Sequence, residues 1–165
     1  IESGKISLIV GFFLVVLFMI YKYRLFGIIA NVSLIANLLM LIGVLTILEA
    51  TLTLPGIAGI ILTVGMAVDA NVLIFERIKE ELRTEKSVIH AFDIGYKKAK
   101  ITVLDANITT LIAALILFIF GSGPVKGFAV TLGIGIVTTL YSAYFIARHL
   151  TSWLVLNKKH ESIKL

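Results

Sequence analysis

The sequence has no cysteine and only two prolines in 165 residues, and only 15% of its residues are charged. Without cysteine, the chain can form neither a disulfide nor a thiolate metal site. Soluble domains carry roughly a quarter charged residues, so the low charge content excludes an ordinary water-soluble domain. In contrast, 59% of the residues are hydrophobic, and the mean hydropathy is +1.04. These values are typical of an integral membrane protein.

The sequence lacks the motifs that are typical of several function classes. No G-x-x-x-x-G-K-[ST] motif is present, so we expect no ATP hydrolysis by this chain. His90, His149 and His160 are scattered without ligand spacing, and we expect no metal site and no cofactor. The net charge of +5 fits loops that face an anionic cytoplasmic leaflet of membrane lipid better than a nucleic-acid partner.

Five segments are long and apolar enough to cross a bilayer. They lie at about 6–21, 28–48, 55–75, 101–120 and 125–147. The sequence therefore predicts an all-α, five-helix transmembrane bundle over residues 1–156, followed by a cytoplasmic tail over 157–165. In the polar connection 77–100, apolar residues are spaced as in short amphipathic helices. There we expect the third helix to project into water, a turn near Thr84, and a separate interfacial helix at about 87–96.

The basic residues predict the orientation of the bundle. Thirteen of the fifteen lie in the segments 22–24, 77–100 and 148–164, and only Lys5 and Lys126 lie on the other side. Because cytoplasmic loops are enriched in lysine and arginine, we expect the C-terminus in the cytoplasm and the N-terminal end outside. That orientation also leads us to expect a further spanning segment upstream of Ile1.

Small residues in the spans predict where helices approach closely. Glycines allow close backbone contact in lipid, where packing replaces the hydrophobic driving force. The third span contains Gly56, Gly59 and Gly65, and the fifth begins with the G-x-x-x-G pair Gly123 and Gly127. We expect these five glycines to mediate helix packing.

Asp69 stands out because it lies well inside the apolar run of the third span. A carboxylate at such a position costs roughly 2.5 kcal/mol or more, and intramembrane acids commonly serve proton relays. No basic residue lies within two turns of Asp69 along its own helix. We therefore predict that Asp69 is a proton-coupling group. The alternative is a neutral carboxyl that hydrogen-bonds a neighbouring helix.

A second Asp-Ala-Asn sequence lies near the start of the fourth span, so that Asp105 and Asn107 parallel Asp69 and Asn71. Residues two apart do not share a helix face, so Asn71 should pack against a neighbour. We predict supporting roles for Asn71, Asp105 and Asn107, although Asp105 could equally anchor the helix start. Two aspartates on successive spans could also suggest an intramembrane protease. Residues 101–105 read ITVLD instead of the required G-x-G-D, so we do not expect an enzyme.

Three stretches closely resemble one family. They are LTLPGIAGIILTVGMAVDANVLIFERIKEELR at 52–83, LDANITT at 104–110 and GPVKGFAVTLGIG at 123–135. These stretches resemble the SecD/SecF family of bacterial protein-export subunits, on the SecD side of the family. The resemblance covers essentially the whole chain.

The resemblance implies an RND-transporter-like membrane fold, of which this chain lacks the first helix and a large periplasmic domain. It implies pairing with SecF, association with the SecYEG channel and the ATPase SecA, and preprotein substrates. Such a pair uses the proton-motive force to assist export across the bacterial inner membrane, and Asp69 matches the family aspartate linked to proton passage. The alternative function is a small-molecule RND-type proton-coupled permease.

Overall fold

The structure is a computed structural model that describes residues 2–84 and 87–157. Its helices are α1 (Glu2–Tyr23), α2 (Leu25–Ile47), α3 (Leu54–Thr84), α4 (Val88–Phe120), α5 (Pro124–Tyr141), the π-helical η1 (Ser142–Ala147) and α6 (Arg148–Asn157). The described residues contain no strand. Helices α1 to α4, together with the continuous α5–η1–α6 helix, are each long and apolar enough to span a membrane. The predicted all-α, five-span architecture is confirmed.

The helix boundaries follow from local chemistry. Pro55 lies in the first turn of α3, where a missing N–H costs nothing, and the Thr53 hydroxyl accepts a hydrogen bond from the Gly56 N–H at 3.1 Å. Ser87 caps α4 by accepting a hydrogen bond from the His90 N–H. Between α1 and α2, Arg24 has a φ of 53°, and this single left-handed residue breaks the helix.

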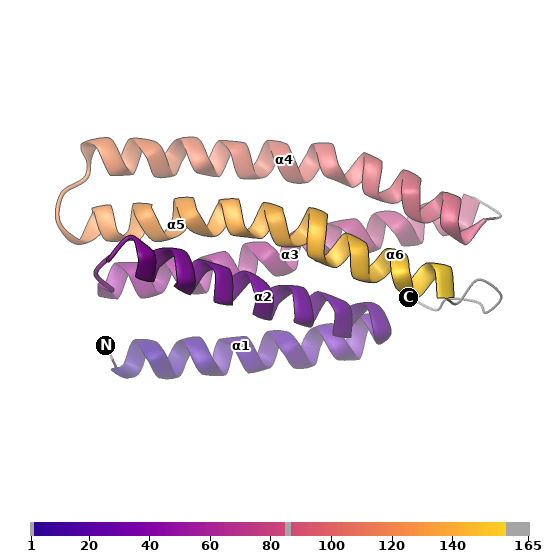
Figure 1. The fold of residues 1–165 in the computed structure, drawn as a ribbon, viewed down its shortest axis with the longest axis horizontal. Helices are drawn as coiled ribbons and strands as arrows, with labels where there is room; N and C mark the ends of the chain where they lie inside the picture. The colour runs from indigo at the N-terminus through magenta and orange to yellow at the C-terminus, as the bar shows by residue number, and fades with distance from the viewer. Residues whose placement is uncertain (1, 85–86, 158–165) are drawn as a thin grey trace.

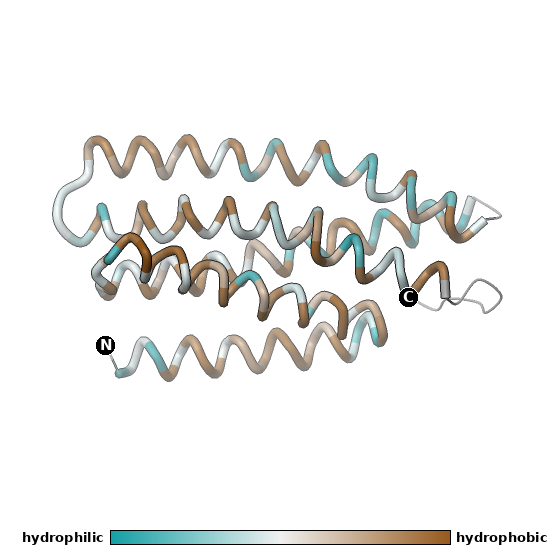
Figure 2. The backbone as a smooth tube through the Cα atoms, viewed as in Figure 1, coloured by the Kyte–Doolittle hydropathy of each residue, from teal (hydrophilic) through white to brown (hydrophobic). Residues whose placement is uncertain are grey.

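The helices form an elongated bundle in which successive spanning helices run in opposite directions, with α5, η1 and α6 as a single span (Figure 1). Helix α3 contacts α1, α2, α4 and α5, and its largest interfaces are with α5 and α4. Near the polar end, the Phe75 ring of α3 packs against the rings of Tyr23 and Phe26, with centroids 5.4 and 5.6 Å apart. Figure 2 shows hydrophilic residues concentrated at the end where α3 and α4 meet.

Helix α4 differs from the sequence prediction. Helix α3 ends at Thr84, and the residues directly after it, where we expect a turn, lie outside the described residues. Helix α4 runs unbroken from Val88 to Phe120, so the expected separate interfacial helix is wrong. Residues 96–101 contain neither glycine nor proline, and nothing there interrupts the helix. The Gly95 backbone also packs on α3, since an added Cβ would lie 2.7 Å from Ile78 Cγ1. Of the predicted tail, Asn157 ends α6, and 158–165 lie outside the described residues.

Of the five glycines predicted to mediate helix packing, three do so within this chain. Gly56 and Gly59 face Thr131 of α5, and Gly127 of α5 faces Thr53, where an added Cβ would lie 2.7 Å from the threonine Oγ1. These three glycines let α3 and α5 approach closely. Among the described residues, a Cβ at Gly65 or Gly123 would meet nothing within 4 Å, so neither glycine mediates a contact within this chain, and the packing role predicted for them stays a prediction. Gly123 instead precedes α5 with a φ of 54°, a conformation that favours glycine.

Buried polar side chains connect α2 to its neighbours. Asn37 Nδ2 donates to Thr139 Oγ1 of α5 at 3.1 Å, and Ser33 Oγ donates to the Ser142 carbonyl of η1 at 3.1 Å. Asn31 Nδ2 donates to the Val16 carbonyl of α1 at 3.3 Å. Such hydrogen bonds hold helices together within a bilayer.

Candidate functional site

Asp69 lies in an open groove between α3 and α4. The groove has a volume of about 250 Å³ and is lined by Met66, Asp69, Ala70 and Leu73 of α3 and by Val103, Ala106, Asn107 and Thr110 of α4. On each helix these residues follow the spacing i, i+3, i+4, i+7 of one helix face. The Asp69 side chain is exposed in this chain, so another component or lipid can reach the carboxyl from the groove.

The polar groups opposite Asp69 are oriented by their own helix. Asn107 Nδ2 donates to the Val103 carbonyl at 2.7 Å, and Thr110 Oγ1 donates to the Ala106 carbonyl at 3.0 Å. Each side chain therefore gives one donor to its own helix, and Asn107 Oδ1 and Thr110 Oγ1 keep the capacity to accept a hydrogen bond. A carboxyl that carries a proton is a donor that these oxygens can accommodate. Among residues 2–84 and 87–157, Asp69 has no ion-pair partner.

The two Asp-Ala-Asn sequences present different residues to the groove. In α3 it is Asp69 that faces the groove, whereas Asn71 is buried and donates from Nδ2 to the Ala67 carbonyl at 3.2 Å. In α4 it is Asn107 that faces the groove, and Asp105 lies outside it on an exposed part of the helix. The groove therefore brings together Asp69 and Asn107 but neither Asn71 nor Asp105. The two aspartates do not line a common site.

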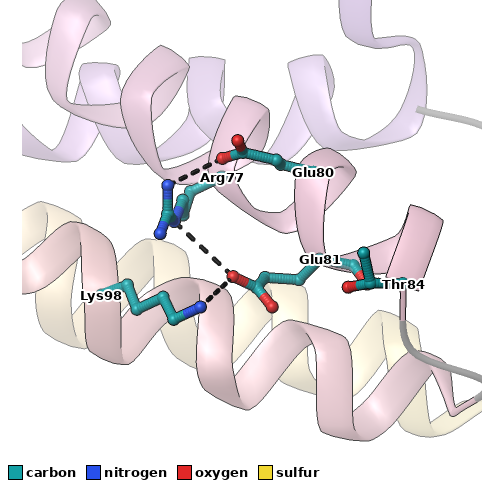
Figure 3. Close-up of polar contacts among 5 residues, drawn as sticks. All are labelled: Arg77, Glu80, Glu81, Thr84 and Lys98. Atoms are coloured by element: carbon teal, nitrogen blue, oxygen red, sulfur yellow. Dashed lines mark hydrogen bonds and ion pairs between the residues drawn. The ribbon is translucent and has the colours of Figure 1, made fainter.

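A second polar site lies nearer the hydrophilic end of α3 and α4, in a pocket of about 490 Å³. Leu73 lines both this pocket and the Asp69 groove, so the two spaces are neighbours. Two lining residues of this pocket, Arg77 and Lys98, also contact Glu81. Figure 3 shows this cluster, where the buried Glu81 carboxylate lies 2.5 Å from Lys98 Nζ and 3.7 Å from Arg77 Nε. Arg77 Nη1 also contacts Glu80 Oε2 at 2.7 Å.

The sequence analysis did not single out Glu81. Its position four residues after Arg77 indicates an ion pair along the helix. Nothing local, however, indicates that Lys98, 17 residues away, approaches from α4. Beside this cluster, Glu76 accepts a hydrogen bond from the Tyr23 hydroxyl at 2.7 Å and lies 3.6 Å from Lys22 and 3.7 Å from Lys79. These contacts attach the end of α1 to α3.

Within the described segments, no three histidine, cysteine or acidic side chains are grouped as a metal ion would require.

Over residues 1–157, the sequence matches the family described as "Protein export membrane protein SecD/SecF, C-terminal". The chain belongs to the SecD/SecF family.

Individual SecD/SecF proteins are similar over nearly the whole chain. The protein translocase subunit SecD of Magnetococcus marinus is 51% identical over 165 residues, which are 100% of this chain and 31% of the relative. The SecD of Desulfurispirillum indicum is 58% identical over 148 residues, which are 90% of this chain and 29% of the relative. The chain thus spans less than a third of these curated relatives.

The fold is also that of a solved SecD/SecF-family structure. The crystal structure of SecDF from Thermus thermophilus, described as a translocon-associated membrane protein, superposes with a TM-score of 0.92 at 42% identity. The match covers 96% of this chain and 22% of SecDF. The resemblance drawn from the motifs is therefore confirmed, and the chain is a multi-pass membrane protein that corresponds to a C-terminal membrane part of this family.

Proposed function

We propose that this chain is the membrane part of a subunit of the bacterial Sec protein-translocation machinery, and that proton movement past Asp69 drives its action on preproteins. The names of its relatives support a role in translocation. The observation that carries the proton coupling is the Asp69 carboxyl itself, which lies in a groove opposite polar acceptors and has no ion pair among the described residues. We propose no enzymatic activity.

The position of α3 explains how protonation could be transmitted. Helix α3 contacts every other spanning helix, so a change in how its Asp69 face packs would reach the whole bundle. The neighbouring pocket contains Glu76, Glu80 and several basic groups, and it can admit water from the hydrophilic end. Glu76 follows Asp69 by seven residues, a helix rise of roughly 10 Å. A proton entering there would therefore cross only a short distance to Asp69.

The groove also suggests the partner. An intramembrane carboxyl normally faces a bundle interior or a water-filled cavity, whereas Asp69 is on the outside of this chain. We propose that SecF, the sister subunit, covers this face in the assembled inner-membrane protein, and that the pair acts with the SecYEG channel and SecA. The distribution of basic residues supports a periplasmic N-terminal end and a cytoplasmic C-terminus.

The decisive experiment compares Asp69→Asn with Asp105→Asn in the full-length protein, reconstituted with SecF in vesicles that carry a pH gradient. Both changes remove one titrating carboxyl from an exposed position, but only Asp69 lines the groove. We expect Asp69→Asn to abolish proton conductance and gradient-dependent preprotein export. Asp105→Asn should retain both. Native conductance and export in Asp69→Asn would refute the proposal.

The same preparations address the alternative of a small-molecule permease. A gradient-driven efflux of drugs, lost in Asp69→Asn while preprotein export is unchanged, would support the permease. Loss of preprotein export without any drug efflux in the native protein would support the translocation subunit.

A further inference from the structure

A separate basic cleft lies between α4 and the η1–α6 segment, on a different part of α4 from the Asp69 groove. The cleft has a volume of about 190 Å³ and is lined by Asp93, Tyr96, Lys97, Lys100, Tyr144 and Arg148. Three cations therefore face a single anion. Asp93 lies 3.7 Å from Arg148 and is itself 66% exposed, so it compensates little of this charge.

The other two cations have no anionic partner. Among the residues that the structure describes, no ion pair involves Lys97 or Lys100. Aromatic rings hold two of the cations in place: Lys100 Nζ lies 5.8 Å from the centre of the Tyr144 ring, and the Arg148 guanidinium lies 5.7 Å from the centre of the Tyr96 ring. The Tyr144 hydroxyl also donates to the Lys100 carbonyl at 3.0 Å, which ties η1 to α4 beside the cleft.

An apolar groove lies farther along the same face, toward the opposite end of the bundle. It has a volume of about 440 Å³, and among its lining residues are Leu111, Leu115 and Phe118 of α4 and Val130, Gly133 and Val137 of α5. Leu111 follows Lys100 by eleven residues, or three helical turns, so both lie on one face of α4. The groove is open beside Gly133: among the described residues, a Cβ there would meet only Leu111 Cδ1, at 4.0 Å.

The spacing between cleft and groove matches one leaflet of a bilayer. Eleven helical residues rise roughly 16 Å, and half of the hydrocarbon core is roughly 15 Å thick. Between the cleft and the groove, α5 exposes Tyr141, whose ring stacks on Phe145 at 5.0 Å. A lipid with its phosphate in the cleft would therefore extend an acyl chain beside Tyr141 as far as Leu111 and Val137.

We propose that this face binds one anionic phospholipid, with its phosphate between Lys97, Lys100 and Arg148 and an acyl chain that runs beside Tyr141 to the near edge of the apolar groove. The uncompensated positive charge selects an anionic headgroup, and basic pockets between membrane helices suit such headgroups. The exposed Tyr141 and the apolar groove farther along this face favour a lipid over a soluble phosphate. This site shares no lining residue with the Asp69 groove, so it is independent of the proposed proton path.

The test measures binding of phosphatidylglycerol to the purified full-length protein by native mass spectrometry during a lipid titration. We compare the native protein, Lys97→Gln/Lys100→Gln, and the control Arg24→Gln/Arg83→Gln. The control removes the same charge from two arginines that have no ion pair among the described residues and lie outside the cleft. A lysine near an anionic lipid contributes roughly fivefold in affinity, so the cleft variant should bind roughly thirtyfold more weakly.

Two further arms identify the ligand and guard against misfolding. Lys97→Arg/Lys100→Arg should bind the lipid as the native protein does, which would show that charge and not the lysine stem is required. Glycerol phosphate, which lacks acyl chains, should not displace the lipid at equal concentration. The proposal is overturned by equal binding in the cleft and control variants, by displacement with glycerol phosphate, or by a native protein that binds no lipid because another helix covers this face.

Discussion

The contact between Gly135 of α5 and Thr63 of α3 gives a sharp test of the packing. An added Cβ at Gly135 would lie 2.7 Å from Thr63 Cγ2 and even nearer to its Oγ1. Thr63 has no exposed surface, and its hydroxyl donates to the Gly59 carbonyl at 2.8 Å. The threonine cannot turn away without losing that bond. Gly135→Ala should therefore overpack the α3–α5 interface, at a cost of about 1–3 kcal/mol.

Gly65→Ala provides a matched control for this prediction. Gly65 also lies in a helix interior, but a Cβ there would meet no described atom of this chain within 4 Å. Alanine is favoured over glycine in a helix by about 1 kcal/mol, and this gain applies to both variants. The difference between their free energies of unfolding consequently isolates the clash, and should be about 1–3 kcal/mol with Gly135→Ala the less stable.

The measurement is the free energy of unfolding of the full-length protein in mild detergent, obtained by denaturant titration. Thr63→Ala in the Gly135→Ala background should restore part of the loss, because it removes the two nearest atoms and leaves Cβ 3.0 Å away. Equal stability of Gly135→Ala and Gly65→Ala, or no recovery with Thr63→Ala, would refute the close approach of α3 and α5.

Two further predictions concern buried polar contacts. Glu81→Gln removes the buried anion that Lys98 and Arg77 share, and because both cations are partly exposed and can be hydrated, the unfolding free energy should fall by about 1–3 kcal/mol. Glu80→Gln, which removes an exposed pair with Arg77, should cost at most about 1 kcal/mol, and equal losses would contradict the buried role of Glu81. Asn37→Ala and Thr139→Val, combined in a double-mutant cycle, should show a coupling of roughly 0.6 kcal/mol. A coupling of zero would argue against their hydrogen bond across α2 and α5.

Hydrophobicity and charge along the chain were sufficient to predict the fold class. The spans at about 55–75 and 101–120 lie within α3 and α4, because backbone groups in lipid must be satisfied within a helix. The polar residues between these spans were harder to interpret. Amphipathic spacing around Ser87–Tyr96 suggested a separate helix, whereas the segment continues α4 and packs its buried side on Ile78.

The candidate site was likewise predictable from the sequence only in part. Asp69 could be selected from sequence because a carboxylate in an apolar span is costly wherever the neighbouring helices lie. The sequence could not show whether Asp105 faces the same groove as Asp69. Each helix presents a different residue of its Asp-Ala-Asn sequence to the groove, Asp69 from α3 and Asn107 from α4, and the rotation of each helix about its axis decides which.

The sequence by itself determined that the chain is helical, spans the membrane and carries one carboxyl deep in its third span. These properties depend on single segments in contact with lipid. Only the tertiary structure decided that Gly135 contacts Thr63, that Lys98 reaches Glu81, and that Lys97, Lys100 and Arg148 share one cleft. Each of these depends on the rotation and depth of two helices relative to one another. Packing between helices fixes both quantities, and no local pattern along either helix specifies them.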